Sequence, residues 1–318
     1  MSEFKRLNII QKNKLSMEEL CKYYREERKF LLENKEKING IKFHNAVHPV
    51  INFLIKGRRI INRQTLTVYH SIPKNIKSPI IFAITHTGKF DIEIVNEAIK
   101  KPYYLLSDDE EFMYRTIDGF VTALNGVIYV DSDFDEDKKI AKATAIKVLK
   151  QQGNVMWFPE GIWNLSPNLL MLPCPFGIID AAIESCATII PIAIDQRNKD
   201  FYVNIGEPIC YESLNIGNIN NKEEKIRAIN ELRDILATLK WEIWEKFPVE
   251  QREFIPDNYY ENFVKEKIAE WPFFTNNDIK KRIYKPKNIV NYEEVFKHLE
   301  EIEINKNNAF LLRKTYKR

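Results

Sequence analysis

The chain has 318 residues, of which 44% are hydrophobic and 29% charged, and these proportions are ordinary for a folded globular protein. Its four cysteines lack C-x-x-C spacing, which argues against a zinc site or a disulfide framework and favours a reducing compartment. No apolar stretch approaches the roughly 20 residues that span a bilayer, and the first residues do not read as a signal peptide. We therefore expect a cytoplasmic protein with a substantial core.

The net charge of +3 is unevenly distributed along the chain. Residues 1–90 contain 18 basic and 7 acidic side chains, and the segment from Lys37 to Lys89 contains nine basic residues and no acidic one. Such a segment attracts anionic partners: phospholipid headgroups, a nucleotide-bearing cofactor, an acidic carrier protein or nucleic acid. The alternative is a solvated basic face with no specific partner.

Two helices are expected before the first strand, over residues 17–38 and 46–62. The second carries apolar residues at helical spacing and then a Lys-Gly-Arg-Arg cluster, residues 56–59. This pattern is typical of a helix that lies in a membrane interface, and equally of a helix packed on a domain with its basic end in water.

From residue 65 the hydrophobic period changes, and short apolar runs alternate with helical segments. Continuous apolar runs such as 80–84 and 189–194 indicate strands buried on both faces of a sheet. The alternation predicts an α/β sheet with helices on both faces. The expected strands are 65–70, 78–85, 103–107, 127–131, 154–158, 188–194 and 201–205. The expected helices are 92–100, 109–124, 136–152, 177–186 and, after the sheet, 222–247.

The first candidate site is His86-Thr87-Gly88-Lys89-Phe90-Asp91, a histidine and an aspartate five positions apart, placed after a buried strand. The carboxyl ends of strands are where α/β proteins place their chemistry. An aspartate one turn into the next helix can fix the tautomer of the imidazole and stabilise the imidazolium. This arrangement suits the removal of a proton from an alcohol, although a structural His–Asp bond that caps a helix is the simpler alternative.

The second candidate is Phe158-Pro159-Glu160-Gly161, which also follows a predicted strand. The glycine permits a tight turn and the glutamate can accept hydrogen bonds from hydroxyls, but a plain strand-terminating turn fits as well. No Gly-x-Ser-x-Gly nucleophile is present. The hydroxyl that the base activates is therefore expected to belong to the substrate.

Other function classes find little support. His44 and His48 have the spacing of two metal ligands on a helix, but no glutamate follows His44 and Pro49 is adjacent, so no metal site is expected. The basic segment lacks a nucleic-acid-binding motif, so no nucleic-acid partner is expected.

Together the motifs make the chain resemble the lysophospholipid/glycerol-phosphate acyltransferase family, typified by 1-acylglycerol-3-phosphate acyltransferases. Four blocks occur in the family's order: His86 to Asp91, Gly126 to Asp131, Phe158 to Gly161, and Ile189 to Ile194. Gly177 matches a further glycine of the family between the last two blocks. The resemblance covers residues 78–208. It implies an αβα layered domain with a largely parallel or mixed central sheet and with N- and C-terminal helical extensions. The expected parts are a basic helical segment, a catalytic domain and a helical extension, at 1–64, 65–215 and 216–318.

The resemblance also implies roles for individual residues. His86 would be the general base and Asp91 its support, while backbone N–H groups near the first block would stabilise the oxyanion. Acyl-CoA or acyl-acyl carrier protein would be the co-substrate, with no bound cofactor. The substrate-binding residues would be Gly88, Lys89, Asp131, Phe158, Pro159, Glu160, Gly161, Trp163 and Asn164.

Three positions depart from the family's pattern. The family commonly has arginine after the second-block aspartate and Thr-Arg after the third block, where this chain has Ser132 and Ile162-Trp163-Asn164. Those arginines suit bidentate phosphate binding. The family also favours serine where this chain has Gly88. A sugar, a polyol or a differently held lysolipid would suit Trp163 and Asn164, and Lys89 is a candidate replacement for a phosphate ligand.

The sequence thus predicts a peripheral O-acyltransferase on the inner face of the cell membrane. The acceptor would be a lysophospholipid, glycerol phosphate or a related glycolipid or polyol, and the basic helices would bind anionic lipid or an acyl carrier protein. Two alternatives remain open: a thioesterase in which water replaces the acceptor, and a lipid- or membrane-binding protein without transfer activity. Because the base must be neutral, activity is expected to rise with pH as His86 loses its proton.

Overall fold

The structure is a computed structural model. It divides into two units, residues 1–283 and 284–318, and all that follows concerns the first. The residues that it describes are 4–12, 14–35, 38, 40–77, 79–108, 116–166, 169–211, 222–248, 252–271 and 282. The predicted helix at 109–124 therefore lies partly outside the described residues, as does much of the predicted 216–318 extension.

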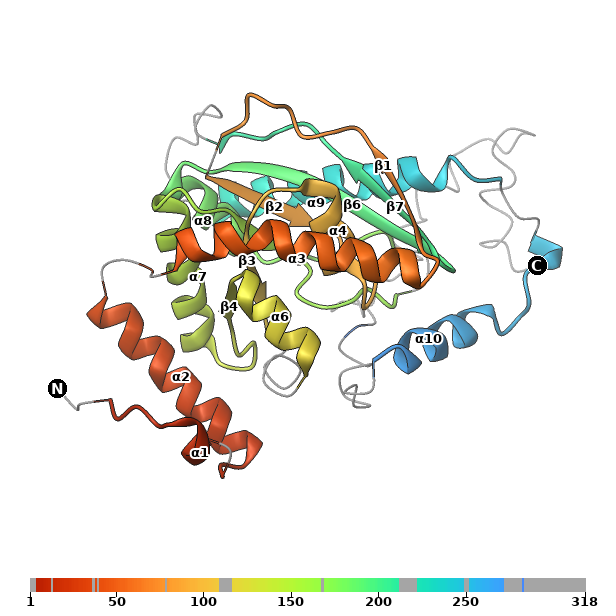
Figure 1. The fold of residues 1–318 in the computed structure, drawn as a ribbon. Helices are drawn as coiled ribbons and strands as arrows, with labels where there is room; N and C mark the ends of the chain where they lie inside the picture. The colour runs from red at the N-terminus through yellow and green to blue at the C-terminus, as the bar shows by residue number, and fades with distance from the viewer. Residues whose placement is uncertain are drawn as a thin grey trace, which may run out of the picture. The chain divides into compact units, whose positions relative to one another are not determined.

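Seven strands of the described chain form one mixed sheet in the order β1-β7-β6-β2-β5-β3-β4 (Figure 1). All neighbouring pairs are parallel except β6 and β7, which form an antiparallel pair. The strands are β1 (Thr65–Tyr69), β2 (Ile80–Ile84), β3 (Tyr104–Ser107), β4 (Val127–Tyr129), β5 (Val155–Trp157), β6 (Thr188–Arg197) and β7 (Asp200–Ile205). The predicted α/β fold with a largely parallel or mixed sheet is confirmed.

Helices cover both faces of this sheet, as the apolar runs predicted (Figure 1). The helices are α1 (Ile9–Lys12), α2 (Met17–Asn34), α3 (Ile41–Ile61), α4 (Asp91–Ile99), α6 (Ile117–Asn125), α7 (Asp135–Lys150), α8 (Gly177–Ser185), α9 (Lys222–Trp244) and α10 (Tyr259–Ala269), with a short 3-10 helix at Arg252–Phe254. Since no helix of the described residues is long and apolar enough to cross a bilayer, none is assigned as a membrane span.

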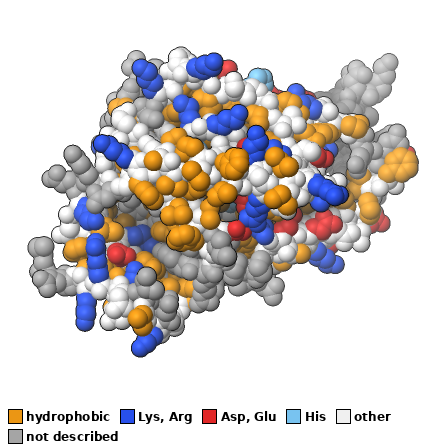
Figure 2. All heavy atoms as spheres, viewed as in Figure 1, with side chains coloured by type: hydrophobic (Ala, Val, Ile, Leu, Met, Phe, Trp, Pro, Cys, Tyr) orange, Lys and Arg blue, Asp and Glu red, His pale blue; other side chains and the backbone are white. Residues whose placement is uncertain are grey.

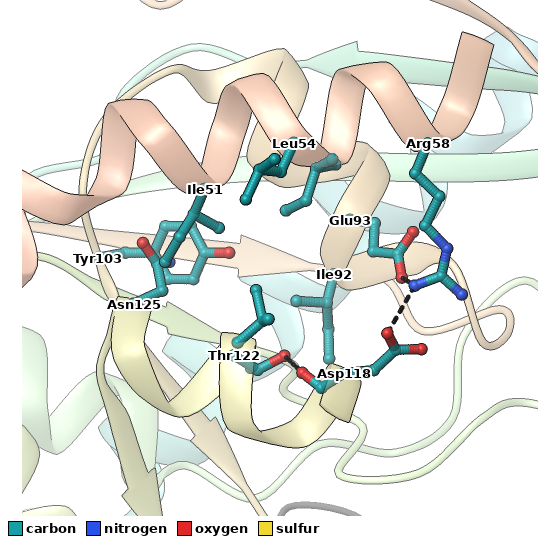
Figure 3. A pocket seen from close by; sticks show the side chains of 11 residues that line it. Ile51, Leu54, Arg58, Ile92, Glu93, Tyr103, Asp118, Thr122 and Asn125 are labelled. Carbon is teal, nitrogen blue, oxygen red and sulfur yellow. Dashed lines mark hydrogen bonds and ion pairs between the residues drawn. The ribbon is translucent and has the colours of Figure 1, made fainter. Parts of the chain in front are cut away.

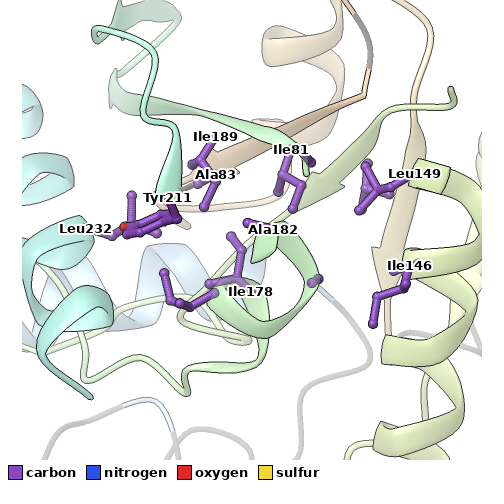
Figure 4. Packing of buried hydrophobic residues seen from close by; sticks show 14 of the residues in the cluster. Ile81, Ala83, Ile146, Leu149, Ile178, Ala182, Ile189, Tyr211 and Leu232 are labelled. Atoms are coloured by element: carbon purple, nitrogen blue, oxygen red, sulfur yellow. The ribbon is translucent and has the colours of Figure 1, made fainter. Parts of the chain in front are cut away.

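The two faces of β2 belong to two separate hydrophobic clusters, because side chains alternate along a strand. Ile81 and Ala83 pack in one cluster with residues of α7, α8 and α9, and Figure 4 shows them directed toward Ile178 and Ala182 of α8. Ile80, Phe82 and Ile84 pack in the other cluster with α4. All five residues of β2 are fully buried, so the end of this strand is held rigidly by the core.

Helices α2 and α3 differ in length from the predicted ones. The first ends at Asn34, not at residue 38, and its start is fixed by a capping box between Ser16 and Glu19. The second begins at Ile41, five residues before the predicted start, directly after Gly40 in the left-handed region with φ of 94°. Glycine adopts that conformation without steric cost, so it permits the earlier start.

Hydrogen bonds and ion pairs attach α2 and α3 to the sheet domain. Arg28 of α2 donates two hydrogen bonds, of 3.0 and 2.7 Å, to the carboxylate of Asp137 at the start of α7. On α3, His44 Nδ1 lies 2.7 Å from the Leu124 carbonyl oxygen, and His48 Nδ1 lies 2.8 Å from Asn125 Oδ1. Both histidines therefore join α3 to the end of α6.

Candidate active site

The first sequence block forms a tight turn between β2 and α4. Thr85, which follows β2, is fully buried, and its hydroxyl accepts a 3.0 Å hydrogen bond from the Ile194 N–H of β6. The chain then turns through His86 and Gly88, and α4 starts at Asp91. The predicted position of His86, at the carboxyl end of a buried strand and ahead of a helix, is what the structure shows.

His86 and Asp91 are in direct contact. The imidazole Nδ1 lies 2.8 Å from Asp91 Oδ2, and the same oxygen accepts a 2.9 Å hydrogen bond from the Gly88 N–H and another from the Thr87 N–H. The Thr87 hydroxyl donates to Asp91 Oδ1 at 2.8 Å. Asp91 is buried, whereas the His86 side chain is 16% exposed. A carboxylate oxygen so placed can accept a hydrogen bond from a proton on His86 Nδ1, which leaves the lone pair on Nε2.

The third block reaches the same turn through Glu160. One carboxylate oxygen of Glu160 accepts a 2.9 Å hydrogen bond from the His86 N–H, and the other accepts one of 2.8 Å from the Leu172 N–H. Burial raises the pKa of Glu160, while the charge of Lys240 and the two N–H groups act in the opposite direction. Glu160 therefore joins the two loops, and Gly161, with φ of 72°, provides the turn that follows it.

These bonds change the expected origin of the oxyanion donors. The N–H groups of Thr87 and Gly88 donate to Asp91, and that of His86 donates to Glu160. All three are engaged within the protein, so the expectation that first-block N–H groups face the oxyanion is wrong for these three.

Aromatic rings surround the histidine. The Phe158 ring is stacked on the imidazole of His86, with centroids 4.2 Å apart, and the Trp163 ring meets it edge-on at 6.0 Å. Phe158 and Trp163 are both buried, and Pro159, which directly follows Phe158, is buried as well. The structure thus brings the first and third blocks together around one imidazole.

Three of the other predicted site residues have partners of their own. The Asn164 side chain bonds within its own loop, to the Leu169 carbonyl and the Ser166 N–H, at 2.8 and 3.0 Å. Asp131 forms an ion pair with Arg25 of α2. Lys89 Nζ lies 5.7 Å from the centroid of the Phe90 ring. Their substrate-binding roles stay predictions.

A pocket of about 150 Å³ adjoins this turn, between α3, α4 and α6 (Figure 3). Its wall is largely apolar, with Ile51 and Leu54 of α3 and Ile92 of α4 directed into it. At one end Arg58 forms ion pairs with Glu93 and Asp118, at 3.2 and 2.9 Å. The pocket begins one residue after Asp91, at Ile92 and Glu93, yet contains none of the predicted site residues.

Sequence reasoning missed one segment at the site, helix α10. Lys267 lies against Gly88, and Trp271, just beyond the helix, contacts Trp163 with ring centroids 6.0 Å apart. Nothing in the polar sequence around residue 267 indicates this position. The signal that could have suggested a nearby side chain was Gly88 itself, the smallest residue at a position where the family favours serine. Among the described residues, no group of three or more His, Cys, Asp or Glu side chains could hold a metal ion.

Comparisons with known proteins agree with this geometry. Residues 60–195 match the family model described as Acyltransferase. A 1-acyl-sn-glycerol-3-phosphate acyltransferase of Saccharomyces cerevisiae is 23% identical over 174 residues, which cover 50% of this chain and 57% of that protein. The crystal structure of the 1-acyl-sn-glycerophosphate (LPA) acyltransferase PlsC from Thermotoga maritima has the same fold, with a TM-score of 0.50 and 17% identity over 72% of this chain and 91% of that one. The resemblance drawn from the four sequence blocks is thereby confirmed by the match to the Acyltransferase family model and by these two similar proteins.

Proposed function

We propose that this protein is an O-acyltransferase. It transfers a fatty acyl group from acyl-CoA or acyl-acyl carrier protein to a hydroxyl of a lysophospholipid, glycerol phosphate or a related glycolipid or polyol. The observation that carries the proposal is the 2.8 Å contact between His86 Nδ1 and the buried Asp91. The imidazole of His86 lies at the carboxyl end of β2 and is partly exposed. This is the geometry of an oriented general base.

The proposed reaction uses this geometry as follows. His86 Nε2 takes the proton of the acceptor hydroxyl as its oxygen attacks the thioester carbonyl, which forms a tetrahedral intermediate. The C–S bond then breaks, the ester forms, and the proton on His86 passes to the leaving thiolate. Asp91 stabilises the imidazolium between these steps. The apolar pocket beside α4 supports a substrate with a hydrocarbon chain.

We further propose that the protein lies on a membrane through the outer face of α3 and the adjoining end of α6. Figure 2 shows hydrophobic side chains gathered across the middle of the view, where Figure 1 places α3, with Lys and Arg side chains around them. The exposed apolar residues of this face are Phe43, Val50, Phe53, Leu54, Ile60, Ile61 and Phe120. Large apolar patches rimmed by charge are typical of interaction surfaces.

The basic part of this face is smaller than the sequence suggested. Arg58 is engaged with Glu93 and Asp118, and Arg59 donates to the Glu97 carboxylate at 2.7 and 3.0 Å. Lys42, Lys56 and Arg63 are exposed. In this proposal the three exposed basic side chains contact anionic lipid headgroups, and the apolar side chains of α3 contribute the remaining binding to the membrane. An acyl carrier protein is a further candidate partner of the basic segment.

The test is mass spectrometry of the products of purified protein. The protein is supplied with acyl-CoA or an acyl-carrier thioester and with a panel of lysolipids, glycerol phosphate and sugar acceptors. The expected result is a mass gain of one acyl group that His86→Ala abolishes without a change in the circular dichroism spectrum. Thioester release that depends on His86 but yields no acylated product would support the thioesterase alternative. Neither activity, with vesicle binding intact, would support the membrane-binding alternative.

A further inference from the structure

Helix α10 is attached to the loop that packs against His86. The Tyr260 hydroxyl donates a 2.6 Å hydrogen bond to the Leu165 carbonyl, two residues after the tryptophan that contacts the imidazole. The rings of Trp163 and Trp271 lie 6.0 Å apart. A segment far along the sequence therefore reaches the candidate active site through two independent contacts.

The side chain that α10 directs into this region is Lys267, which is only 9% exposed. Its ammonium group lies beside Gly88, because a Cβ added at Gly88 would be 3.1 Å from Lys267 Nζ. Real Cβ atoms rarely approach another atom so closely, so a larger residue at position 88 would press on the ammonium. The absence of a side chain at Gly88 thus leaves the space that the cation occupies, two residues from the general base.

The partners of the ammonium group are one amide oxygen and one carboxylate. Lys267 Nζ donates to Gln196 Oε1 at 3.0 Å, and it lies 3.3 and 3.4 Å from the two carboxylate oxygens of Glu270. Charge-assisted hydrogen bonds are typically about 2.7–2.9 Å long, so the pair with Glu270 is loose. The Glu270 side chain is 27% exposed and can turn toward solvent. An anion with several acceptor oxygens would bind the ammonium better than Glu270 does, since a buried cation gains most from a close partner.

The acceptor phosphate would be such an anion, and this chain lacks the arginines that would suit it. Ser132 and Ile162-Trp163-Asn164 occupy the positions at which arginines would suit a phosphate. A phosphate next to the reacting hydroxyl therefore needs a cation from another part of the fold, and Lys267 is buried beside the turn that carries the base.

We propose that Lys267 binds the phosphate group of the acyl acceptor. The proposal rests on the proposed function and specifies its acceptor class: a hydroxyl compound that carries a phosphate monoester. In the free protein Glu270 holds the place of the phosphate, and on binding the acceptor displaces the Glu270 carboxylate from the ammonium. Lys267 is thus an acceptor-binding residue, and Gly88 is the position that makes room for it.

The experiment compares two acceptors that differ in the phosphate alone, a 1-acylglycerol 3-phosphate and the matching 1-acylglycerol. Lys267→Gln is expected to raise the KM for the phosphorylated acceptor by about tenfold or more, because it removes a charge-assisted bond, and to leave kcat/KM for the neutral acceptor unchanged. Glu270→Gln is expected to lower the KM for the phosphorylated acceptor, because the competing carboxylate is gone. Lys265→Gln, an exposed lysine on the same helix, is the matched control and should change neither value.

Three results would overturn the proposal. Equal losses for both acceptors would assign Lys267 a structural role, and unchanged kinetics would remove it from the site. The third concerns the donor, since CoA also carries phosphates. The assays are repeated with a short acyl thioester of N-acetylcysteamine, which has none, and a defect seen with acyl-CoA alone would assign the cation to the donor.

A binding measurement separates this proposal from the proposed function. Calorimetric titration of sn-glycerol 3-phosphate into the His86→Ala protein, with and without Lys267→Gln, needs no turnover. If the wild-type protein transfers no acyl group, binding that requires Lys267 still supports the phosphate site, and binding that does not require it refutes the site. Should Lys267→Gln fail to fold, Lys267→Arg takes its place, because it keeps the charge at this position and must retain the binding of sn-glycerol 3-phosphate if a cation there holds the phosphate.

Discussion

The carboxyl end of β2 and the outer face of α3 differ in which kind of group they bury and which they expose. At the turn after β2, polar groups are buried, and Asp91 alone accepts hydrogen bonds from two backbone N–H groups and a hydroxyl besides its contact with His86. On α3, large apolar side chains are exposed, with Phe53 at 76%. Both arrangements are costly in a free globular protein, and each is explained by what the region would contact.

The difference shows how each region relates to a substrate. The polar turn is complete within the protein, so its geometry is set before any ligand binds, as general-base catalysis requires. The face of α3 is incomplete, because its apolar area is buried only when something else covers it. We therefore expect substitutions in the turn to act on turnover and substitutions on the face to act on localisation.

The largest effect is expected for Asp91→Asn. The amide cannot match all four donors that Asp91 accepts, and it cannot stabilise the imidazolium, so kcat should fall by about a thousandfold or more. Steady-state acyl transfer with saturating substrates measures this change. Asp234→Asn, at an exposed position of α9, is the control. A fall of less than tenfold would mean that Asp91 does not support the base.

A smaller effect is expected for Phe53→Ser on the outer face of α3. Removal of an exposed phenyl ring that inserts into the interface should weaken binding to anionic vesicles by about tenfold, with turnover of a water-soluble substrate unchanged. Vesicle co-sedimentation measures the affinity. Trp241→Ser, on the exposed side of α9, is the comparison variant and should bind as the wild type does. Equal losses in the two variants would remove α3 as the docking face.

The smallest effect is expected at the inner side of α3, where His48 is 2% exposed. Burial lowers the pKa of His48, and the hydrogen bond with Asn125 opposes that shift. Below the ordinary pKa of 6.5 the unfolded chain therefore binds a proton that the folded chain does not. The free energy of unfolding consequently decreases as the pH is lowered, by at most about 1.4 kcal/mol per pH unit. Urea unfolding at pH 7.5 and 5.5 should show a smaller loss for His48→Gln than for the wild type. An identical loss in both proteins would exclude His48 as the cause.

Much of the fold could be predicted because its signals are local. The runs at 80–84 and 189–194 are continuous and apolar, which only a strand covered on both faces accommodates, and both form central strands β2 and β6. The His86–Asp91 contact could be predicted for the same reason, since a strand end and a helix start five residues apart place the two side chains together. The start of α3 was misplaced because it depends on the backbone conformation of Gly40 and not on a hydrophobic pattern.

The sequence by itself determined the α/β class, the order of the blocks and the contact between His86 and Asp91, because strand periodicity and short-range spacing are properties of neighbouring residues. Only the tertiary structure decided that Glu160 accepts a hydrogen bond from the His86 N–H and that Lys267 lies against Gly88. It also decided that Arg58 and Arg59 form ion pairs with residues of α4 and α6. These contacts join residues 35 to 179 positions apart. Their partners are selected by how helices and loops pack on the sheet, and no local pattern in the chain specifies that packing.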